Sequence, residues 1–491
     1  MKKMKVFVRF ILFLMVTLLC IGVTEKLLTP KYYYTDKWPT TTTYSDFYRL
    51  NKNSADVLFF GSSHAVSAFN PQELYDRYGI TSYNMGCEQQ SLLLTYYWLK
   101  EALKYQTPKA VVLDTYILHT YKGAVGKPLN CTEATIRKSM DSMHWNANKM
   151  NAIQDICHAD QTQSSVSFYL PNVRFHTRWY GLAENDFTAG ELSEHSGTFG
   201  FSAFSNIDGT KFTPLSEKSS DKKEEMVPMM RSYLDQITAL CQGKNIPLIL
   251  VKTPSRYQTI ERHNSTKEYA CTHNLPFYDF NMSDLYEASG FDAATMNESH
   301  LNIWGSVSIT DYLGKILQSK YKISSHVDMQ WKSAEYNYRE VEKDCNLVKI
   351  MKIHDYMGYL KDKRYTVFVV TQGNIKDLVD KKLQQEMQTL GFTADLIQMT
   401  DRTYYYGAET PLGKKEEMSG EALQYKGSIR KGKSVYSVTA ASNVSSVQID
   451  GKEYVSSARG IHIVVYDNDR EQVVDSVCFS RNSDGTASAS R

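Results

Sequence analysis

A short apolar run that ends in small residues constrains the fold of this chain most strongly. Residues 56–60 read DVLFF, a run of strand length with β-branched and aromatic side chains, and Gly61-Ser62-Ser63 follows directly. Pro71 then stands at a helix-start position. A strand that ends in such a turn places a hydroxyl at the carboxyl edge of a sheet, where open α/β sheets build their sites. The same residues also make a good plain turn, so this stretch alone leaves both interpretations open.

Apolar runs of strand length recur through the first two thirds of the chain, separated by helical stretches. Residues 109–114 read KAVVLD, residues 246–252 read IPLILVK and residues 276–280 read PFYDF. An amphipathic stretch at 225–242 precedes the second of these runs. Strands that alternate with helices imply a parallel sheet with right-handed crossovers, so we expect an α/β domain over residues 51–325.

The amino terminus carries a membrane-targeting pattern. Four cationic residues precede residues 10–23, a stretch without Asp, Glu or Lys. Counted back to Val6, this stretch approaches the length that a tilted helix needs to span a bilayer. The positive charges predict a cytoplasmic amino terminus and an extracytoplasmic chain after Thr24. A signal peptide is the alternative, but no A-x-A cleavage site follows, so we favour an uncleaved anchor over residues 1–24. Residues 25–50 then form a tether rich in Thr and Tyr.

Composition and charge limit the kinds of partner. The chain has 491 residues, which favours about two to four domains. Its net charge is only +2 and no basic block stands out, so nothing favours nucleic-acid binding. Its 8 cysteines stand singly, without a CxxC pair, so we expect no zinc site or other metal centre.

Residues 115–224 interrupt the alternation of strands and helices, and we expect them to form an insertion over the site edge of the sheet. Cationic and aromatic side chains gather within it, where residues 174–179 read RFHTRW. A surface helix with a packed tryptophan is one interpretation. The other is a wall that binds an anionic or sugar-like substrate by charge and stacking. The candidate substrate-binding residues are Arg174, His176, Arg178 and Trp179.

A histidine follows the last strand of the predicted α/β domain. Residues 297–305 read NESHLNIWG, which places His300 before an apolar run that enters a helix. In a parallel sheet, the turn after the first strand and the loop after the last can converge above the carboxyl edge. Ser63 at one and His300 at the other make a nucleophile and its base. A lone histidine is more often structural, so the pair carries this prediction.

These motifs resemble the SGNH hydrolase superfamily. The chain is similar to its membrane-anchored, extracytoplasmic branch, which includes alginate-acetylation and lipoteichoic-acid D-alanylation proteins. The resemblance implies a flavodoxin-like parallel sheet, Ser63 as the nucleophile and His300 as the base. It also implies an oxyanion hole formed by the backbone amides of Ser63 and Gly86. It covers about residues 56–317 and is carried by Gly61-Ser62-Ser63, Asn84-Met85-Gly86 and Ser299-His300-Leu301-Asn302.

Three positions depart from the family's pattern. Ser62 stands where many members carry Asp, and no asparagine follows the strand that ends at Asp114. Asn297 stands three residues before His300, where the family places an orienting Asp. Asparagine can hold one imidazole tautomer, but it cannot balance an imidazolium with charge. The alternative orienting groups are Glu298 and Asp292.

The alternation of strand-like and helical stretches ends after residue 325. Residues 326–344 are charged and aromatic without a strand rhythm, and we interpret them as a domain junction. A β-rich α+β domain is expected over residues 345–481 and a disordered polar tail over residues 482–491. The domain is predicted from a helical stretch at 376–390, the hairpin signal Asp450-Gly451, and strand-like runs at 365–371, 435–441, 446–449, 461–466 and 473–479.

Three segments of the second domain read SVQIDGKEY at 446–454, RGIHIVVYD at 459–467 and VDSVCF at 474–479. In these segments the chain resembles the interleukin-like EMT inducer domain. That domain also forms the stem of the enzyme that adds N-acetylglucosamine to O-mannose, where it binds carbohydrate. The resemblance is compatible with a structural β domain and with a sugar-binding module. Cys345 and Cys478, near its two ends, are either a disulfide pair or free thiols.

Together these features predict an extracytoplasmic serine acyl-ester enzyme, either an O-acetyltransferase or an esterase, that acts on a cell-surface or secreted polysaccharide. The chemistry needs no cofactor. The family resemblance implies a membrane-bound acyltransferase partner that delivers the acyl donor. The alternative is a membrane-anchored, glycan-binding scaffold whose α/β domain is degenerate and has lost catalysis.

Overall fold

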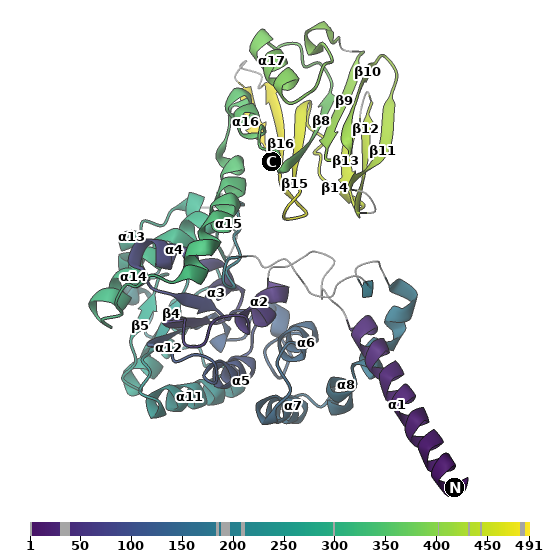
Figure 1. Ribbon diagram of the computed structural model, residues 1–491. Coiled ribbons are helices and arrows are strands. Elements are labelled where there is room, and N and C mark those ends of the chain that lie inside the picture. The colour runs from purple at the N-terminus through teal and green to yellow at the C-terminus, as the bar shows by residue number, and fades with distance from the viewer. Residues whose placement is uncertain are drawn as a thin grey trace. The chain divides into compact units, whose positions relative to one another are not determined.

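The chain divides into two compact units, Met1–Arg339 and Glu340–Arg491. The computed structural model describes residues 2–29, 40–182, 186–187, 197–207, 212–297, 300–400, 402–430, 433–441, 444–481 and 487–491. Figure 1 shows the helices and strands of both units. Each unit has its own hydrophobic cores.

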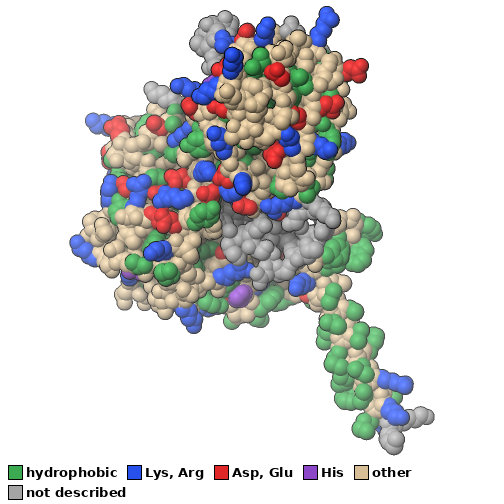
Figure 2. All heavy atoms as spheres, turned by 45° about the horizontal axis from the view of Figure 1, so that its top comes forward, with side chains coloured by type: hydrophobic (Ala, Val, Ile, Leu, Met, Phe, Trp, Pro, Cys, Tyr) green, Lys and Arg blue, Asp and Glu red, His purple; other side chains and the backbone are tan. Residues whose placement is uncertain are grey.

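The amino-terminal helix α1 spans Lys2–Leu28 and is long and apolar enough to cross a membrane. Its apolar side chains are exposed, and Figure 2 shows them along the helix with Lys and Arg side chains near its free end. The helix is compatible with a single-pass anchor and also with a signal sequence. It extends four residues beyond the predicted anchor. Residues 30–39 of the predicted tether, 25–50, lie outside the described residues. The expectation of a tether is wrong for α2 (Thr40–Phe47), which buries Tyr44 and Phe47 in a hydrophobic core of the first unit.

The first unit is built on a five-stranded parallel sheet, which confirms the α/β prediction. Its strands lie in the order β2-β1-β3-β4-β5, the order found in flavodoxin-like folds. The four longer apolar runs form strands as predicted, whereas the three-residue β2 was not foreseen as one. The strands are β1 (Val57–Phe60), β2 (Ser82–Asn84), β3 (Ala110–Asp114), β4 (Leu248–Lys252) and β5 (Phe277–Asp279).

Helices cover both faces of this sheet because successive strand residues point to opposite sides. Leu58 and Phe60 belong to one core, which also contains side chains of α5, α11 and α12. Val57 and Phe59 belong to the other, with side chains of α3, α4, α13 and α14. These helices are α3 (Ser63–Ala68), α4 (Pro71–Tyr78), α5 (Leu92–Ala102), α11 (Pro228–Gly243), α12 (Ile260–Thr272), α13 (Ser283–Ala288) and α14 (Ile303–Ser319).

The predicted insertion, residues 115–224, is helical wherever a regular element is described. Its helices α6 and α7 contact α5, so this part packs onto one face of the α/β core. The elements are η1 (Tyr116–Leu118), η2 (Lys122–Ala124), α6 (Glu133–Asp141), α7 (Ala147–Ala159), α8 (Ser165–Tyr169), α9 (Pro171–Phe175), η3 (His176–Gly181) and η4 (Glu217–Ser219). Short elements elsewhere in the unit are α2 (Thr40–Phe47), η5 (Ala293–Thr295), β6 (Met296–Asn297) and β7 (His300–Leu301).

The second unit is a β-rich domain with two sheets. A six-stranded sheet has the order β10-β9-β8-β15-β16-β17, and a four-stranded sheet has the order β11-β12-β13-β14. Helices α16 (Ile353–Tyr359) and α17 (Lys381–Thr389), with η6 (Leu347–Lys349) and η7 (Leu396–Gln398), complete it. The strands are β8 (Tyr365–Gln372), β9 (Tyr404–Thr410), β10 (Gly413–Ser419), β11 (Leu423–Arg430), β12 (Lys433–Ala440), β13 (Ser445–Ile449), β14 (Lys452–Glu453), β15 (Gly460–Asp467), β16 (Gln472–Arg481) and β17 (Ala487–Ser490).

Two expectations for this unit need correction. A disordered tail was predicted from residue 482, but β17 pairs antiparallel with β16, so its backbone groups are bonded in a ladder. Residues 482–486 lie outside the described residues. Strands β9, β10 and β11 were also not foreseen. Of the alternatives for Cys345 and Cys478, the structure shows two buried, free thiols.

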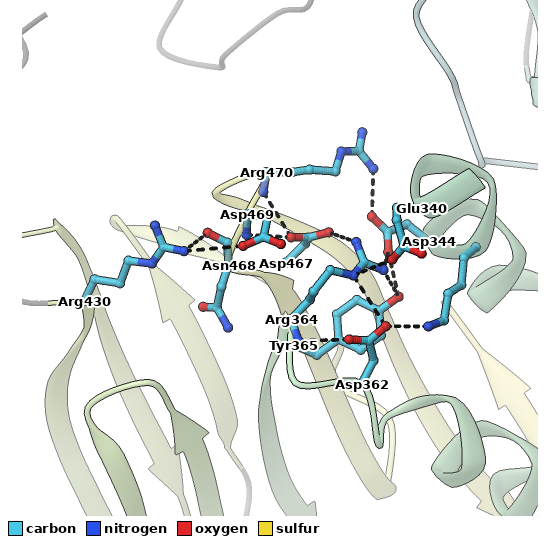
Figure 3. Close-up of polar contacts among 11 residues, drawn as sticks. Glu340, Asp344, Asp362, Arg364, Tyr365, Arg430, Asp467, Asn468, Asp469 and Arg470 are labelled. Carbon is cyan, nitrogen blue, oxygen red and sulfur yellow. Dashed lines mark hydrogen bonds and ion pairs between the residues drawn. The ribbon is translucent and has the colours of Figure 1, made fainter. Parts of the chain in front are cut away.

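Helix α15 (Met329–Asn346) occupies the predicted junction, and the unit boundary falls inside it. Before the boundary, the Tyr338 hydroxyl donates to Glu73 Oε1 at 3.0 Å and accepts from Asn70 Nδ2 at 2.9 Å. After the boundary, Asp344 accepts from Arg470 at 2.8 Å and from the Tyr365 hydroxyl at 2.6 Å, within the ionic network of Figure 3. The first turns of α15 therefore belong to the α/β unit and its last turns to the β-rich unit.

Candidate active site

Ser63 and His300 meet at the carboxyl edge of the parallel sheet. Ser63 is the first residue of α3, directly after the turn that ends β1, and His300 begins β7. Ser63 Oγ lies 2.9 Å from His300 Nε2, although 237 positions separate the two residues in the chain. The structure therefore brings together the two side chains that the sequence nominates as nucleophile and base.

The turn between β1 and α3 fixes the place of Ser63. Gly61 has a φ of +146°, and a Cβ there would lie 2.7 Å from Asp114 Cβ, so the close approach of β1 and β3 excludes a side chain. Ser62 is the N-cap of α3 and accepts a hydrogen bond from the His64 N–H at 3.4 Å. Its hydroxyl also donates to Asp114 Oδ2 at 3.4 Å. Ser62 thus has a structural role, which leaves Ser63 as the hydroxyl that faces the histidine.

The protonation state of His300 suits a general base. Burial lowers the pKa of His300 to about 4, so the ring is neutral at neutral pH. A neutral imidazole whose Nε2 lacks a proton can accept the Ser63 proton at the observed distance. The arrangement can therefore generate a serine nucleophile without a metal or cofactor. In the described part of the chain, no group of three or more His, Cys, Asp or Glu side chains is placed to hold a metal ion.

A stack of rings lies behind His300, and the sequence analysis missed it. The ring of His64 stacks on that of His300 with centroids 4.3 Å apart and an angle of 18° between planes. Tyr116 stacks on the other side of His64 at 3.7 Å. His64 is buried, and this burial, with the neighbouring His300, lowers its pKa well below the ordinary value. His64 is therefore a neutral ring that holds the plane of His300. The position of His64 directly after Ser63 is the sequence feature that could have pointed to this contact.

The two expected oxyanion donors differ in the structure. Among the described residues, the Ser63 N–H has no hydrogen-bond partner, so it is available to an oxyanion. The Gly86 N–H instead donates to Asn84 Oδ1 at 3.0 Å. Asn84 Nδ2 in turn donates to the carbonyls of Ala65 and Phe69, which ties the end of β2 to α3. The Gly86 amide is therefore engaged in positioning α3.

Of the three residues proposed to orient His300, the structure describes Asn297 and Asp292. Asn297 pairs with His300 across the β6–β7 ladder, but among the described residues its side chain makes no hydrogen bond to the His300 ring. The Asp292 carboxylate accepts from the backbone amides of Ala294 and Thr295, so it caps η5 instead. Glu298, together with Ser299 of the quoted motif, lies outside the described residues.

Asp114, at the end of β3, is a buried acid near the nucleophile. Burial raises its pKa to about 7, and its partners include Ser62 Oγ and the backbone amide of Tyr116. These contacts hold the β1–α3 turn against β3. His300 is not among the described partners of this carboxyl group, so Asp114 supports the turn and does not orient the base.

One segment of the insertion lies beside the Ser63–His300 pair. The Ser202 N–H donates to the Val66 carbonyl at 3.0 Å, and the Ile303 N–H donates to the Phe204 carbonyl at 2.8 Å. The Phe204 ring lies 6.2 Å from that of His300. Residues 197–207 therefore bridge α3, which carries Ser63, and the first residue of α14, which follows β7 in the chain. No periodic pattern in the sequence marked this segment, because its backbone has no regular structure.

The four candidate substrate-binding residues lie elsewhere in the insertion. Arg174 pairs with Glu133 of α6, and His176 Nδ1 contacts the Val173 carbonyl at 3.1 Å. Arg178 pairs with Asp186 and donates to the carbonyl of Leu28, at the end of α1, while Trp179 is exposed. Figure 1 shows α8 and α1 set apart from α3. The described contacts of this cluster thus connect α9 and η3 to α1 and α6, and none joins it to Ser63 or His300.

Comparison of the chain with protein-family models and with curated proteins finds no match.

Proposed function

We propose that this protein is a membrane-anchored serine acyl-ester enzyme, an O-acetyltransferase or esterase of the SGNH type, that acts on a cell-surface polysaccharide outside the cytoplasm. The observation that carries the proposal is the 2.9 Å contact between Ser63 Oγ and the neutral His300 Nε2 at the carboxyl edge of a parallel sheet. Such a pair needs only an acyl ester within reach to act as a nucleophile and base.

The proposed reaction has two halves. Ser63 Oγ attacks the ester carbonyl carbon while His300 Nε2 takes the hydroxyl proton, and the Ser63 N–H stabilises the oxyanion. The ester C–O bond then breaks, His300 returns the proton to the leaving alcohol, and the acyl group stays on Ser63. Water or a polysaccharide hydroxyl next gives its proton to His300 and attacks the carbonyl carbon of the acyl-serine. The bond between this carbon and Ser63 Oγ then breaks, and His300 returns the proton to Ser63 Oγ. Water yields hydrolysis, and a sugar hydroxyl yields transfer.

Several features support a glycan substrate and a membrane location. The resemblance of the Ser63, Gly86 and His300 motifs to the SGNH branch that modifies surface polymers supports both. The apolar helix α1 supports an anchor that leaves the rest of the chain extracytoplasmic. The family resemblance implies a membrane-bound acyltransferase as the partner that delivers the acyl donor. The β-rich unit, which resembles a stem-type domain, supports a carbohydrate-binding module.

A serine-directed fluorophosphonate tests this function directly. The full-length protein should form a covalent adduct that peptide mass spectrometry maps to Ser63, because His300 activates that hydroxyl alone in α3. Ser67, in the same helix, donates to the His64 carbonyl at 3.3 Å and is the internal control that should stay unmodified. A protein that is folded and shows no adduct at Ser63 is the glycan-binding scaffold, not the enzyme.

Removing the β-rich unit should separate binding of the polymer from the chemistry. A chain that ends after residue 343 keeps Tyr338 and its bonds to the α/β unit. We expect its KM for a polysaccharide ester to rise by about tenfold or more, because tethered binding raises the local substrate concentration. Hydrolysis of a small acetyl ester should stay unchanged, and steady-state kinetics on both substrates measures the two effects.

The position of the cut supplies its control. A chain that ends after Ala334 loses Tyr338, which is fully buried, and its thermal unfolding midpoint should fall below that of the longer truncation. Loss of small-ester turnover in the folded longer truncation would mean that the β-rich unit completes the active site. The module proposal would then be wrong.

A further inference from the structure

We propose that an aromatic and aliphatic surface on α8, α9 and η3 rests on the outer face of the lipid bilayer beside the end of α1. This inference rests on the proposed function in one respect, since it needs α1 to be kept as an anchor. The surface, called the α8–η3 surface, consists of Val166, Tyr169, Leu170, Val173, Trp179 and Tyr180.

Large apolar side chains are exposed at unusual density on this surface. Tyr180 is 95% exposed, Trp179 58%, Val166 51% and Val173 50%. Leu170, Tyr169 and the nearby Phe187 are also exposed. Single exposed hydrophobic residues are ordinary in soluble proteins, whereas a contiguous group marks a surface that something covers.

The contacts of this surface with α1 indicate that the lipid bilayer covers it. Asn172 Nδ2 donates to Thr24 Oγ1 at 3.0 Å, and Arg178 donates to the carbonyl of Leu28. Helices α1 and α9 also pack together. Residues 6–23 of α1, which are apolar apart from Arg9 and Thr17, extend over about 27 Å at 1.5 Å per residue, close to the hydrocarbon thickness of a membrane. Arg9 lies near the inner end, where a long cationic side chain reaches the headgroups. Thr24 and Leu28 therefore lie at the outer headgroup level, and so does the segment bonded to them.

The residue types fit the headgroup region. Tryptophan and tyrosine concentrate at membrane–water interfaces because their rings are apolar and their polar groups hydrogen-bond to headgroups and water. Trp145 extends the surface, since its ring stacks on that of Tyr169 with centroids 5.4 Å apart. The two arginines of the cluster each pair with a carboxylate, Arg174 with Glu133 and Arg178 with Asp186. We therefore expect apolar and aromatic contact, rather than anionic lipid, to dominate the binding.

This assignment gives the RFHTRW cluster a different role from a substrate wall. Arg178 joins η3 to the last turn of α1, and Trp179 and Tyr180 project beside it. With α1 spanning the membrane and the α8–η3 surface lying on it, the α/β unit has two attachments instead of one. Two attachments restrict rotation of the unit about the anchor and keep Ser63 at a fixed height above the bilayer.

Lipid-dependent quenching in nanodiscs tests the proposal with the full-length protein. A bimane label is attached to a Tyr180→Cys variant whose other exposed or half-buried thiols are removed by Cys20→Ala, Cys157→Ala and Cys271→Ser. The lipid is phosphatidylcholine that carries a nitroxide on an upper acyl-chain carbon. We expect at least about twofold stronger quenching at residue 180 than at a matched Val327→Cys control, since Val327 is apolar and 76% exposed but outside the surface.

A second measurement avoids labels. Brominated phosphatidylcholine should quench part of the tryptophan fluorescence of the native chain, and Trp179→Phe should reduce the quenched fraction. Equal bimane quenching at residues 180 and 327, or no change with Trp179→Phe, would overturn the surface assignment. Quenching that disappears at high salt would also overturn it, because it would show charge attraction.

The intact mass of the same sample separates the two proposals. A chain that keeps residues 1–28 but shows equal quenching at both positions contradicts the α8–η3 surface and leaves the anchored enzyme standing. A chain cleaved after α1 contradicts the anchor and the surface together, while adduct formation at Ser63 still reports on the chemistry.

Discussion

Replacing Ser63 with alanine is expected to lower acetyl-ester turnover by at least about a thousandfold, because no other hydroxyl in α3 faces His300. Ser63 Oγ has His300 Nε2 as its hydrogen-bond partner, and the cap of α3 comes from Ser62. Removing the Ser63 hydroxyl should therefore change the free energy of unfolding only slightly. Hydrolysis of a chromogenic acetyl ester measures the loss, and a thermal melt shows that the variant is folded.

Ser67→Ala is the matched control for this substitution. Ser67 lies in the same helix and is buried, but its hydroxyl donates to the His64 carbonyl and not to an imidazole nitrogen. We expect it to lower stability slightly and to keep turnover. If Ser63→Ala instead retains near wild-type turnover, Ser63 is not the nucleophile and the assigned roles at this site fail.

Burial of every side chain made strands β1 and β4 predictable from the sequence. Runs such as VLFF in β1 and LILVK in β4 fit few structures other than a central parallel strand, since every side chain is buried. The missed strand β10 reads GKKEEMS and is mostly exposed. It lies at the edge of its sheet, where backbone pairing with β9 rather than side-chain burial holds it. Apolar patterns cannot detect such strands.

The Ser63–His300 pair was predictable because topology alone brings it together. In a parallel sheet, the carboxyl ends of the strands share one edge, and this rule needs no knowledge of side-chain packing. The stack of Tyr116, His64 and His300 follows from no such rule, because three separate segments determine where the rings meet. The hydrogen bond from the Gly86 N–H to Asn84 Oδ1 likewise depends on a rotamer.

The RFHTRW cluster shows the limit of arguing from residue types. Its cations and aromatic rings suit a glycan, and they equally suit a membrane interface. Only the contacts of Asn172 with Thr24 and of Arg178 with Leu28 show that this segment lies at the end of α1. Which surface a cluster serves depends on where its helix packs, and that information is non-local.

Replacing His300 with alanine is expected to lower kcat/KM by roughly 10²–10⁴-fold, the usual contribution of a general base. The pH profile gives the more specific result. Burial lowers the pKa of His300 to about 4, and the active base is the neutral ring. The kcat/KM of the native protein should therefore rise through about pH 4 and stay level above it, instead of rising near the ordinary histidine value of about 6.5.

A substitution at Asn297 tests the role of His300 by raising the pKa of its ring instead of removing the ring. It pairs with His300 across the β6–β7 ladder, so Asn297→Asp places a carboxylate next to the imidazole. A nearby negative charge stabilises the imidazolium, which should raise the pKa of His300 and move the acid limb of the profile to higher pH. Activity at neutral pH should be kept or increased.

The double variant Asn297→Asp/His300→Ala is the control, and it should show no acid limb that belongs to the histidine. Kinetics that His300→Ala leaves unchanged would contradict the serine–histidine pair. An acid limb that stays in place in Asn297→Asp would show that residue 297 does not act on the base. The orienting group would then be another residue.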